Sequence, residues 1–231
     1  SAADRSPVQQ RDRPREQALI ILRGTERGEP ADHLLDQARS AFEGRDNAFI
    51  LELVYGVLRN RSRIDWLLDR FSKQPVSSTD EWTRNLLRLA AYQLLFLDKV
   101  PPSAAVNTAT GLAKEHGRKS GYVNGLLRTL ERNRNDLPLP AGKDAAQRLS
   151  VLYSHPAWLV RRWVDRIGAG QAEEVLRRNN NDAPLVIRTN TLGNSRDGLI
   201  ALLEQQGAAV RRTRYSPAGI ELLSSPGITA L

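Results

Sequence analysis

The segment LLRLAAYQLLFL, residues 86–97, is apolar on almost every side when it is wound into a helix. A helix of this kind has to be covered by other elements all round, so it is predicted to be the centre of a helical bundle. Ser78 or Thr79 is predicted to cap its start, and Val100 with Pro101 to end it.

Amphipathic segments on both sides of this helix supply its expected neighbours. Before it, apolar residues recur at helical spacing in 18–22, 31–42, 50–58 and 64–71. The short sequence RNRSR, residues 59–63, leaves no room for a long loop and predicts a tight corner between the third and fourth helices. After it, PPSAAV opens a sixth helix that ends at Gly117, and residues 121–133 form a seventh. The expected fold is mainly α, with a seven-helix bundle in residues 1–138.

A second module is predicted in residues 139–231, after the linker-like sequence NDLPLPAG. Two short helices come first, in SHPAWLVRRWVDRIG and GQAEEVLRRNN. PLVIRTN, SRDGLIALLEQQG, AAVRRTRY and GIELLS then follow in the order β, α, β, β, which is typical of a small α/β module. Three strands and one helix are few for an independent domain, so we expect the polypeptide to continue in the natural protein.

The chain is strongly basic, with a formal net charge of +8 that comes mostly from arginine. Arginine presents a planar fork that suits phosphate groups, and the surplus therefore favours an anionic polymer as the partner. No apolar run reaches the roughly 20 residues that cross a bilayer, and no secretory signal opens the sequence. We expect a soluble, cytoplasmic protein with no membrane partner.

Residue chemistry indicates a binding protein. The sequence has no cysteine, which excludes a thiolate nucleophile and thiolate metal ligands, and its three histidines have no partner at ligand spacing. No glycine-rich phosphate loop is present. We therefore predict no catalytic residue, no metal site and no cofactor within this chain.

Basic clusters are the best candidates for a binding site, although each cation taken alone is also compatible with a solvated surface charge. In the GYVNGLL segment we expect the Asn124 amide to cap the following helix, and Gly125 to avoid a collision between two helices, with ligand contact as a second role. The candidates in the first module are Arg11, Arg13 and Arg15 near the N-terminus, Arg59, Arg61 and Arg63 at the corner, and Lys119, Asn124 and Arg128 around GYVNGLL.

The order of motifs resembles a known family. LVYGVLRNRSRIDWLL, LLRLAAYQLLFLDKVPPSAAVNTA and GYVNGLLRTL are similar to the NusB-like RNA-binding bundle found at the N-terminus of RsmB (Sun/Fmu-type) small-subunit rRNA cytosine-C5 methyltransferases. HPAWLVRRW, NNNDAPLVIRTN and SRDGLIALLEQQG are similar to the linking region of those enzymes. Free-standing NusB antitermination factors end after the bundle, so the second module favours the methyltransferase family.

This resemblance implies a further domain that binds S-adenosylmethionine (SAM) and carries the catalytic cysteine, which this chain lacks. The chain is then expected to bind rRNA and position it for its own C-terminal methyltransferase domain. Without that domain it is expected to have no methyltransferase activity. The resemblance also places RNA contacts at the first-helix arginines, matches Asn124 to the family's VNG element, and adds Arg188 in VIRTN as a candidate RNA or domain contact. Asp12 interrupts the basic arm and weakens it as the principal RNA site.

Two other functions remain open at this point. The bundle is also compatible with a NusB-type antitermination or protein-interaction module, in which it docks a partner protein. A third interpretation makes it a stability domain for a distant active site.

Overall fold

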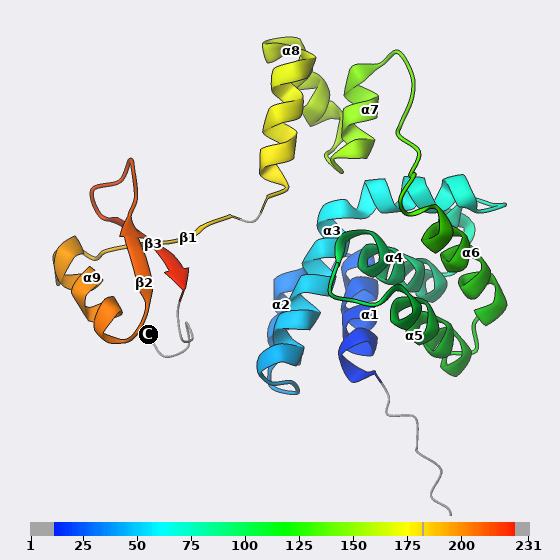
Figure 1. The fold of residues 1–231 in the computed structure, drawn as a ribbon, viewed down its shortest axis with the longest axis horizontal. Coiled ribbons are helices and arrows are strands. Elements are labelled where there is room, and N and C mark those ends of the chain that lie inside the picture. The colour runs from blue at the N-terminus through cyan, green and yellow to red at the C-terminus, as the bar shows by residue number, and fades with distance from the viewer. Residues whose placement is uncertain (1–11, 182, 225–231) are drawn as a thin grey trace, which may run out of the picture. The chain divides into compact units, whose positions relative to one another are not determined.

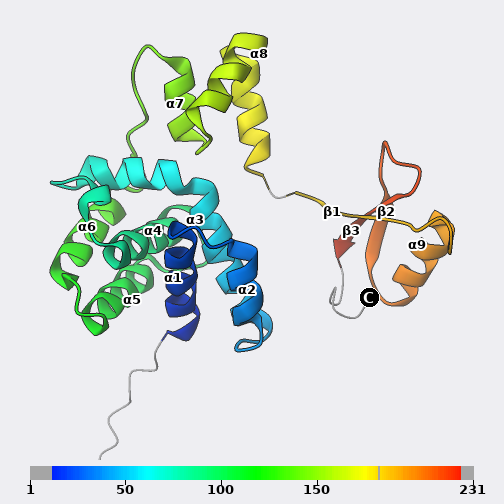
Figure 2. The same cartoon turned by 180° about the vertical axis from the view of Figure 1, so that it is seen from behind.

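The computed structural model describes residues 12–181 and 183–224 and divides the chain into two compact units, one up to Asn180 and one from Asn181 onward. Helices dominate the described residues, which confirms the mainly α fold (Figures 1 and 2). The first unit contains α1 (Arg13–Glu26), α2 (Ala31–Arg39), α3 (Gly44–Phe71), a 3-10 turn (Val76–Ser78), α4 (Glu81–Phe96), α5 (Pro102–Glu115), α6 (Ser120–Asn133), α7 (Ala145–Leu152) and α8 (Ala157–Asn179).

Helix α4 is the centre of the bundle, as its apolar sequence predicts. It packs against α1, α3, α5 and α6 (Figure 1). Its residues from 85 to 94 are all buried. The cap differs from the expected one: Asp80 accepts a hydrogen bond from the backbone N–H of Thr83 at 3.1 Å, one residue after the predicted Thr79. An aspartate at this position satisfies a helix donor that has no partner within the helix.

The predicted break at RNRSR is wrong, because α3 continues through it as one helix from Gly44 to Phe71. Figures 1 and 2 show the helix changing direction part-way along. In this stretch Asn60 donates from its side chain to the carbonyl of Gly56 at 3.0 Å, and the backbone N–H of Arg63 donates to Oγ of Ser154 at 2.9 Å. Side chains that bond to a helix backbone are a recognised cause of bending, so the corner is a bend within one helix.

The close approach of α3 to α4 depends on Gly56. A Cβ atom at this position would overlap the ring of Tyr92 on α4. The Tyr92 hydroxyl in turn donates to the carboxylate of Glu52, one turn earlier on α3. The glycine therefore makes the space that the buried tyrosine occupies.

Helices α7 and α8 pack on each other around Ala146, Leu149, Val160 and Leu176. Gly168, with φ of +78°, interrupts α8, so the two short helices expected here are present as two segments that meet at this glycine. Contacts group both helices with the bundle, in the unit that ends at Asn180. The division of the chain into functional domains at residue 138 stays a prediction.

The second unit has the expected order β, α, β, β: β1 (Leu185–Arg188), α9 (Arg196–Gln205), β2 (Ala209–Arg212) and β3 (Gly219–Ser224). The strands form an antiparallel sheet in the order β1-β3-β2. Ser195 caps α9 by accepting from the N–H of Gly198 at 3.0 Å. Leu203 on α9 packs with Ala208, Ile220 and Leu222 in a small core. In the part of the chain that is described, no helix is long and apolar enough to span a membrane.

Candidate nucleic-acid interface

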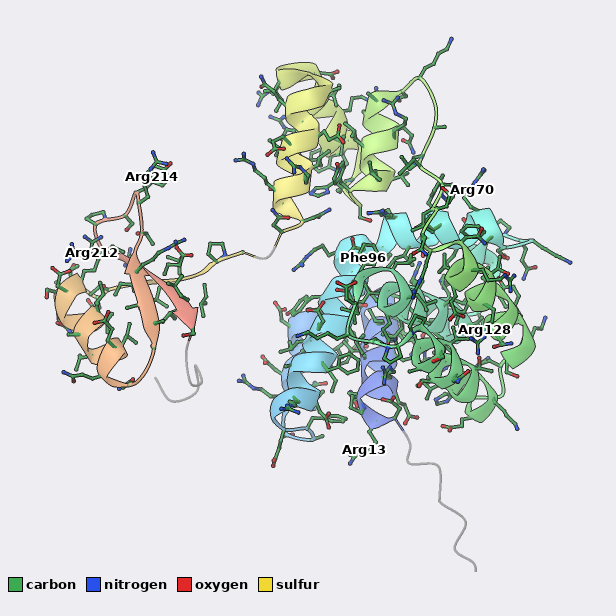
Figure 3. All side chains as sticks on the ribbon, viewed as in Figure 1. Arg13, Arg70, Phe96, Arg128, Arg212 and Arg214 are labelled. Atoms are coloured by element: carbon green, nitrogen blue, oxygen red, sulfur yellow. The ribbon has the colours of Figure 1, made fainter. Side chains whose placement is uncertain are left out.

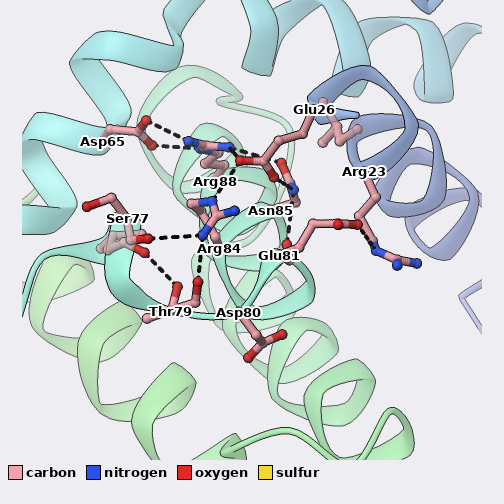
Figure 4. A network of polar contacts seen from close by, with 12 residues as sticks. Arg23, Glu26, Asp65, Ser77, Thr79, Asp80, Glu81, Arg84, Asn85 and Arg88 are labelled. Carbon is pink, nitrogen blue, oxygen red and sulfur yellow. Dashed lines mark hydrogen bonds and ion pairs between the residues drawn. The ribbon is translucent and has the colours of Figure 1, made fainter. Parts of the chain in front are cut away.

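Several arginines are committed to ion pairs inside the bundle (Figure 4). Arg88 on α4 is buried and donates to both carboxylate oxygens of Asp65 on α3, at 2.7 and 2.8 Å. It also reaches Glu26 on α1 at 3.3 Å, and Arg84 donates to the same carboxylate at 2.7 Å. Asn85 donates to Glu26 at 2.5 Å. These arginines tie α1, α3 and α4 together, and their donors are not free for a ligand.

The network also changes the acidity of its members. Burial alone would raise the pKa of Glu26, but hydrogen bonds from Arg84 and Asn85 and the charge of Arg88 hold that pKa below its usual range. Burial would lower the pKa of Arg88, but its bonds to Asp65 and the nearby Glu26 raise that pKa above the ordinary value. Glu26 therefore stays ionised and Arg88 stays cationic.

The three N-terminal candidates have different surroundings. Arg11 lies outside the described residues. Arg13 is exposed, and its guanidinium lies 5.4 Å from the ring centroid of Phe42. Arg15 is half-buried and donates to Gln93 and to Asp12, each at 2.5 Å. Asp12, which interrupts the basic arm, accepts from the N–H of Arg15 at 3.3 Å and caps α1.

The α3 bend brings together the second group of candidates. Arg59 and Arg61 are exposed. Arg63 is half-buried, and its guanidinium lies 5.5 Å from the ring centroid of Phe96. Burial lowers the pKa of Arg63. The bend therefore exposes Arg59 and Arg61, whereas Arg63 is half-buried against an aromatic ring.

In the GYVNGLL segment the expected structural roles of Asn124 and Gly125 are wrong. Helix α6 begins at Ser120, with the exposed Lys119 at its cap position, so Asn124 lies in the second turn and cannot cap the helix. A Cβ atom at Gly125 would meet nothing within 4 Å, so no neighbouring helix requires this glycine. Asn124 is half-buried between helices, where its side-chain oxygen lies 3.5 Å from the hydroxyl of Thr110 on α5.

Helix α6 also lines a cavity of about 570 Å³ beside the end of α3. Gly121 and Gly125 lie along it, and Tyr122, also in its lining, is 3.0 Å from Ser72 between the two hydroxyl oxygens. Arg128, one turn after Asn124 as expected, donates to Asn107 and to Glu131 at 3.0 Å each. The segment thus forms a partly polar surface, and the donors of Arg128 in it are bound to Asn107 and Glu131.

The predicted sites do not form one patch. Figure 3 shows Arg13 and Arg128 at separate places on the bundle, both apart from Arg70. Arg59, Arg61 and Arg63 are neighbours along α3, and Asn124 and Arg128 are one turn apart on α6. Arg188 lies in the second unit, exposed at the end of β1 opposite Gly219.

Sequence reasoning did not single out three exposed aromatic or arginine positions. Trp158 on α8 is 68% exposed, and Tyr215 is 87% exposed with the Arg214 guanidinium 5.2 Å from its ring centroid. The guanidinium of Arg70 lies 5.8 Å from the ring centroid of Trp66. The available signal was the spacing of tryptophan, tyrosine and arginine in WLVRRW, RY and WLLDR.

The residues that the structure describes form no site that fits SAM or a metal ion. The described sheet is small and antiparallel, and the sequence holds no glycine-rich loop between a strand and a helix that would cradle a nucleotide. Among the described residues no group of histidine, aspartate and glutamate side chains could hold a metal ion. The exposed arginines of the bundle, among them Arg13, Arg59 and Arg61, are instead suited to contact an extended anion.

Comparison with known proteins identifies the family. The model of the NusB family matches residues 12–132, just over half of the chain. The chain belongs to the NusB family. A second model, the RsmF/B-like methyltransferase ferredoxin-like domain, matches residues 155–229. This pairing of a NusB domain with an RsmF/B-like domain confirms the resemblance drawn from the motifs.

Curated relatives of this NusB-family chain carry the name of an rRNA methyltransferase. The probable ribosomal RNA small subunit methyltransferase B of Bacillus subtilis (strain 168) is 32% identical over 182 residues, which are 78% of this chain and 40% of the relative. Ribosomal RNA small subunit methyltransferase B of Escherichia coli O1:K1 / APEC is 30% identical over 192 residues, 82% of this chain and 43% of the relative. The chain therefore spans less than half the length of these relatives.

Solved structures agree on the fold. NusB of T. maritima is 26% identical, with a TM-score of 0.50, over 54% of this chain and 92% of that one. The protein PH0851 is 22% identical, with a TM-score of 0.61, over 94% of this chain and 50% of that one, and it shows the fold alone. The likeness to T. maritima NusB thus covers about half of this chain, whereas the likeness to the longer protein PH0851 covers nearly all of it.

Proposed function

We propose that this chain binds small-subunit ribosomal RNA and positions it for a SAM-dependent cytosine-C5 methyltransferase. The observation that carries the proposal is the presence of a NusB domain and an RsmF/B-like ferredoxin-like domain in one chain. The relatives that match most of this chain are named small-subunit rRNA methyltransferases. The proposed place of action is the cytoplasm, and the proposed partners are rRNA and the methyltransferase domain of the same protein.

The chemistry of the reaction assigns catalysis elsewhere. Methylation at C5 of cytosine uses a thiolate that adds to C6 and makes C5 nucleophilic toward the methyl group of SAM. This sequence has no cysteine and no glycine-rich loop of the kind that binds SAM. The proposal therefore gives catalysis and SAM binding to the part of the relatives that this chain does not span, and RNA binding to this chain.

Exposed arginines support RNA binding by the bundle. Arg13 and Arg61 project from α1 and α3, and neither forms an ion pair with a described carboxylate. Phosphate contacts of this kind make affinity fall as salt rises, because bound counterions are released from the RNA.

The test is binding of the chain to a small-subunit rRNA stem-loop and to a scrambled RNA of equal length, across a salt series. We expect the stem-loop to bind more tightly, with log affinity falling linearly as log salt rises. Arg61→Ala should weaken binding and reduce the salt slope by roughly one phosphate contact. Arg178→Ala is the matched control, because Arg178 is also exposed but is paired with Glu174 at 2.6 Å. Equal, weak binding of both RNAs would refute the proposal.

A protein-docking role for the bundle is the second candidate, because the bundle alone covers 92% of T. maritima NusB. In that case a chain ending at Pro138 should bind the partner protein as tightly as the whole chain does. RNA affinity of the whole chain would then be weak and insensitive to Arg61→Ala.

A further inference from the structure

Trp158 stands out on the surface of the first unit. It lies in the first turn of α8, and 68% of its surface is exposed. Tryptophan is rarely left this open to water, because its ring is the largest apolar side chain and favours burial or a partner. The nearby Trp163, by contrast, packs against the α7–α8 core.

Two unpaired arginines follow Trp158 along the helix. Arg162 and Arg166 come four and eight residues later, so the three side chains lie on neighbouring turns of one face. Both arginines are exposed, and no carboxylate among the described residues pairs with either. Arg161 differs, because it pairs with Asp144 at 2.5 Å. The face therefore combines an open indole ring with two cations, and the exposed Asp165, seven residues after Trp158, lies on it as well.

The start of α8 is fixed to the bundle close to the α3 bend. Ser154, four residues before Trp158, accepts the backbone N–H of Arg63 at 2.9 Å. The turn is held further because Ser150 donates to the carbonyl of His155 at 2.7 Å, and Asn180 donates to the carbonyl of Tyr153 at 2.9 Å. The residue four positions before Trp158 is thus bonded to the residue two positions after Arg61.

Such a surface suits an unpaired RNA nucleotide. Unstacked bases bind by stacking on aromatic side chains, and the flanking phosphates bind arginine. We propose that Trp158 stacks on an unpaired base of the RNA while Arg162 and Arg166 contact its backbone. This inference rests on the proposed RNA-binding function and names a site for it. Arg162 and Arg166 outnumber Asp165 on this face, and the net positive charge beside the ring favours RNA over an apolar protein surface.

The experiment compares the affinity of the chain for a single-stranded RNA and for a fully paired duplex of the same sequence. Trp158→Ala should weaken binding of the single strand about tenfold and leave duplex binding unchanged. Trp158→Phe keeps an aromatic face and should retain most of the affinity. Ile167→Ala is the control, because Ile167 is an exposed apolar residue on the same helix segment. Unchanged thermal unfolding would show that the variants fold.

Each outcome decides between the claims. Equal single-strand affinity for Trp158→Ala and the unchanged chain overturns the stacking site and leaves the proposed RNA-binding function standing. Equal losses on single strand and duplex also overturn it, because stacking requires an unpaired base. If Trp158→Ala changes only self-association in sedimentation, the face is a protein interface and the proposal fails. Failure of the unchanged chain to bind either RNA refutes the proposed function itself.

Discussion

Two glycines in the bundle have opposite surroundings, and this predicts opposite effects of the same substitution. A Cβ atom at Gly56 would overlap the Tyr92 ring, whereas a Cβ atom at Gly125 would project into open space. Gly56→Ala should lower the free energy of unfolding by about 1–3 kcal/mol, as overpacked cores do. Gly125→Ala should raise it by up to about 1 kcal/mol, because alanine favours a helix.

Urea unfolding of both variants beside the unchanged chain measures this difference. A destabilised Gly125→Ala would mean that the residue packs against a neighbour after all. An unchanged free energy of unfolding for Gly56→Ala would mean that the Tyr92 ring can move out of the space between α3 and α4 without destabilising the fold.

Single residues were the hardest feature to predict from sequence. The expected cap at Asn124 assumed a helix start near that residue, but α6 begins at Ser120, four residues earlier. The first residue of a helix is hard to place from sequence, and a shift of one turn changes a cap into an interior position. The sequence makes Arg15 and Arg63 candidate RNA contacts. In the structure Arg15 donates to Gln93, and the guanidinium of Arg63 lies over the ring of Phe96. Contacts between residues far apart in the chain leave no local signal.

Among the elements, α1, α3 and α4 are joined by the ion pairs of Arg88. Arg88→Ala would leave Asp65 and Glu26 without their shared partner in a partly buried site. We expect this substitution to lower the free energy of unfolding by about 3 kcal/mol. Arg178→Ala, which removes an exposed ion pair, should change it by less than about 1 kcal/mol. Urea titrations measure both, and equal small losses would show that the buried pairs contribute little.

Acid should weaken the same junction. The pKa of Glu26 is held below its ordinary value of 4.5, so its ion pairs stabilise the folded chain fully above that value. This contribution is lost as pH falls through the lower folded-state pKa. Unfolding free energy measured from pH 7 downward should therefore fall at acid pH, and less steeply in Glu26→Gln. An equal slope for Glu26→Gln and the unchanged chain would contradict the assignment.

Elements were largely readable from sequence, with informative exceptions. Periodic apolar residues located the central helix α4, and Gly168 marked the break in α8. The sequence RNRSR looked like a helix boundary because it is polar throughout. It contains no glycine or proline, however, and arginine favours helix, so the backbone continues through the bend. The absence of glycine and proline from these five residues indicated a continuous helix more reliably than their polarity indicated a boundary.

At the scale of the whole molecule, motif order identified both family modules, whereas the compact units follow contacts. The large bundle core and the α7–α8 core both belong to the unit that ends at Asn180, and the core around Leu203 belongs to the other. The sequence pattern places the residues of α7 and α8 in the same module as the strands, and it does not predict α7 as a helix. The hydrogen bond from Arg63 to Ser154 could not be foreseen, because its partners are 91 residues apart.

Separate cores predict separate unfolding. All four tryptophans, Trp66, Trp82, Trp158 and Trp163, lie in the first unit, so tryptophan fluorescence reports on that unit alone. The second unit has one small core and is expected to be marginally stable. Heating should therefore change the far-UV circular dichroism in two steps and the fluorescence only in the later one. A chain ending at Asn180 should keep the later step at the same temperature. Coincident transitions, or a lower melting temperature for the shortened chain, would show instead that the two units stabilise each other.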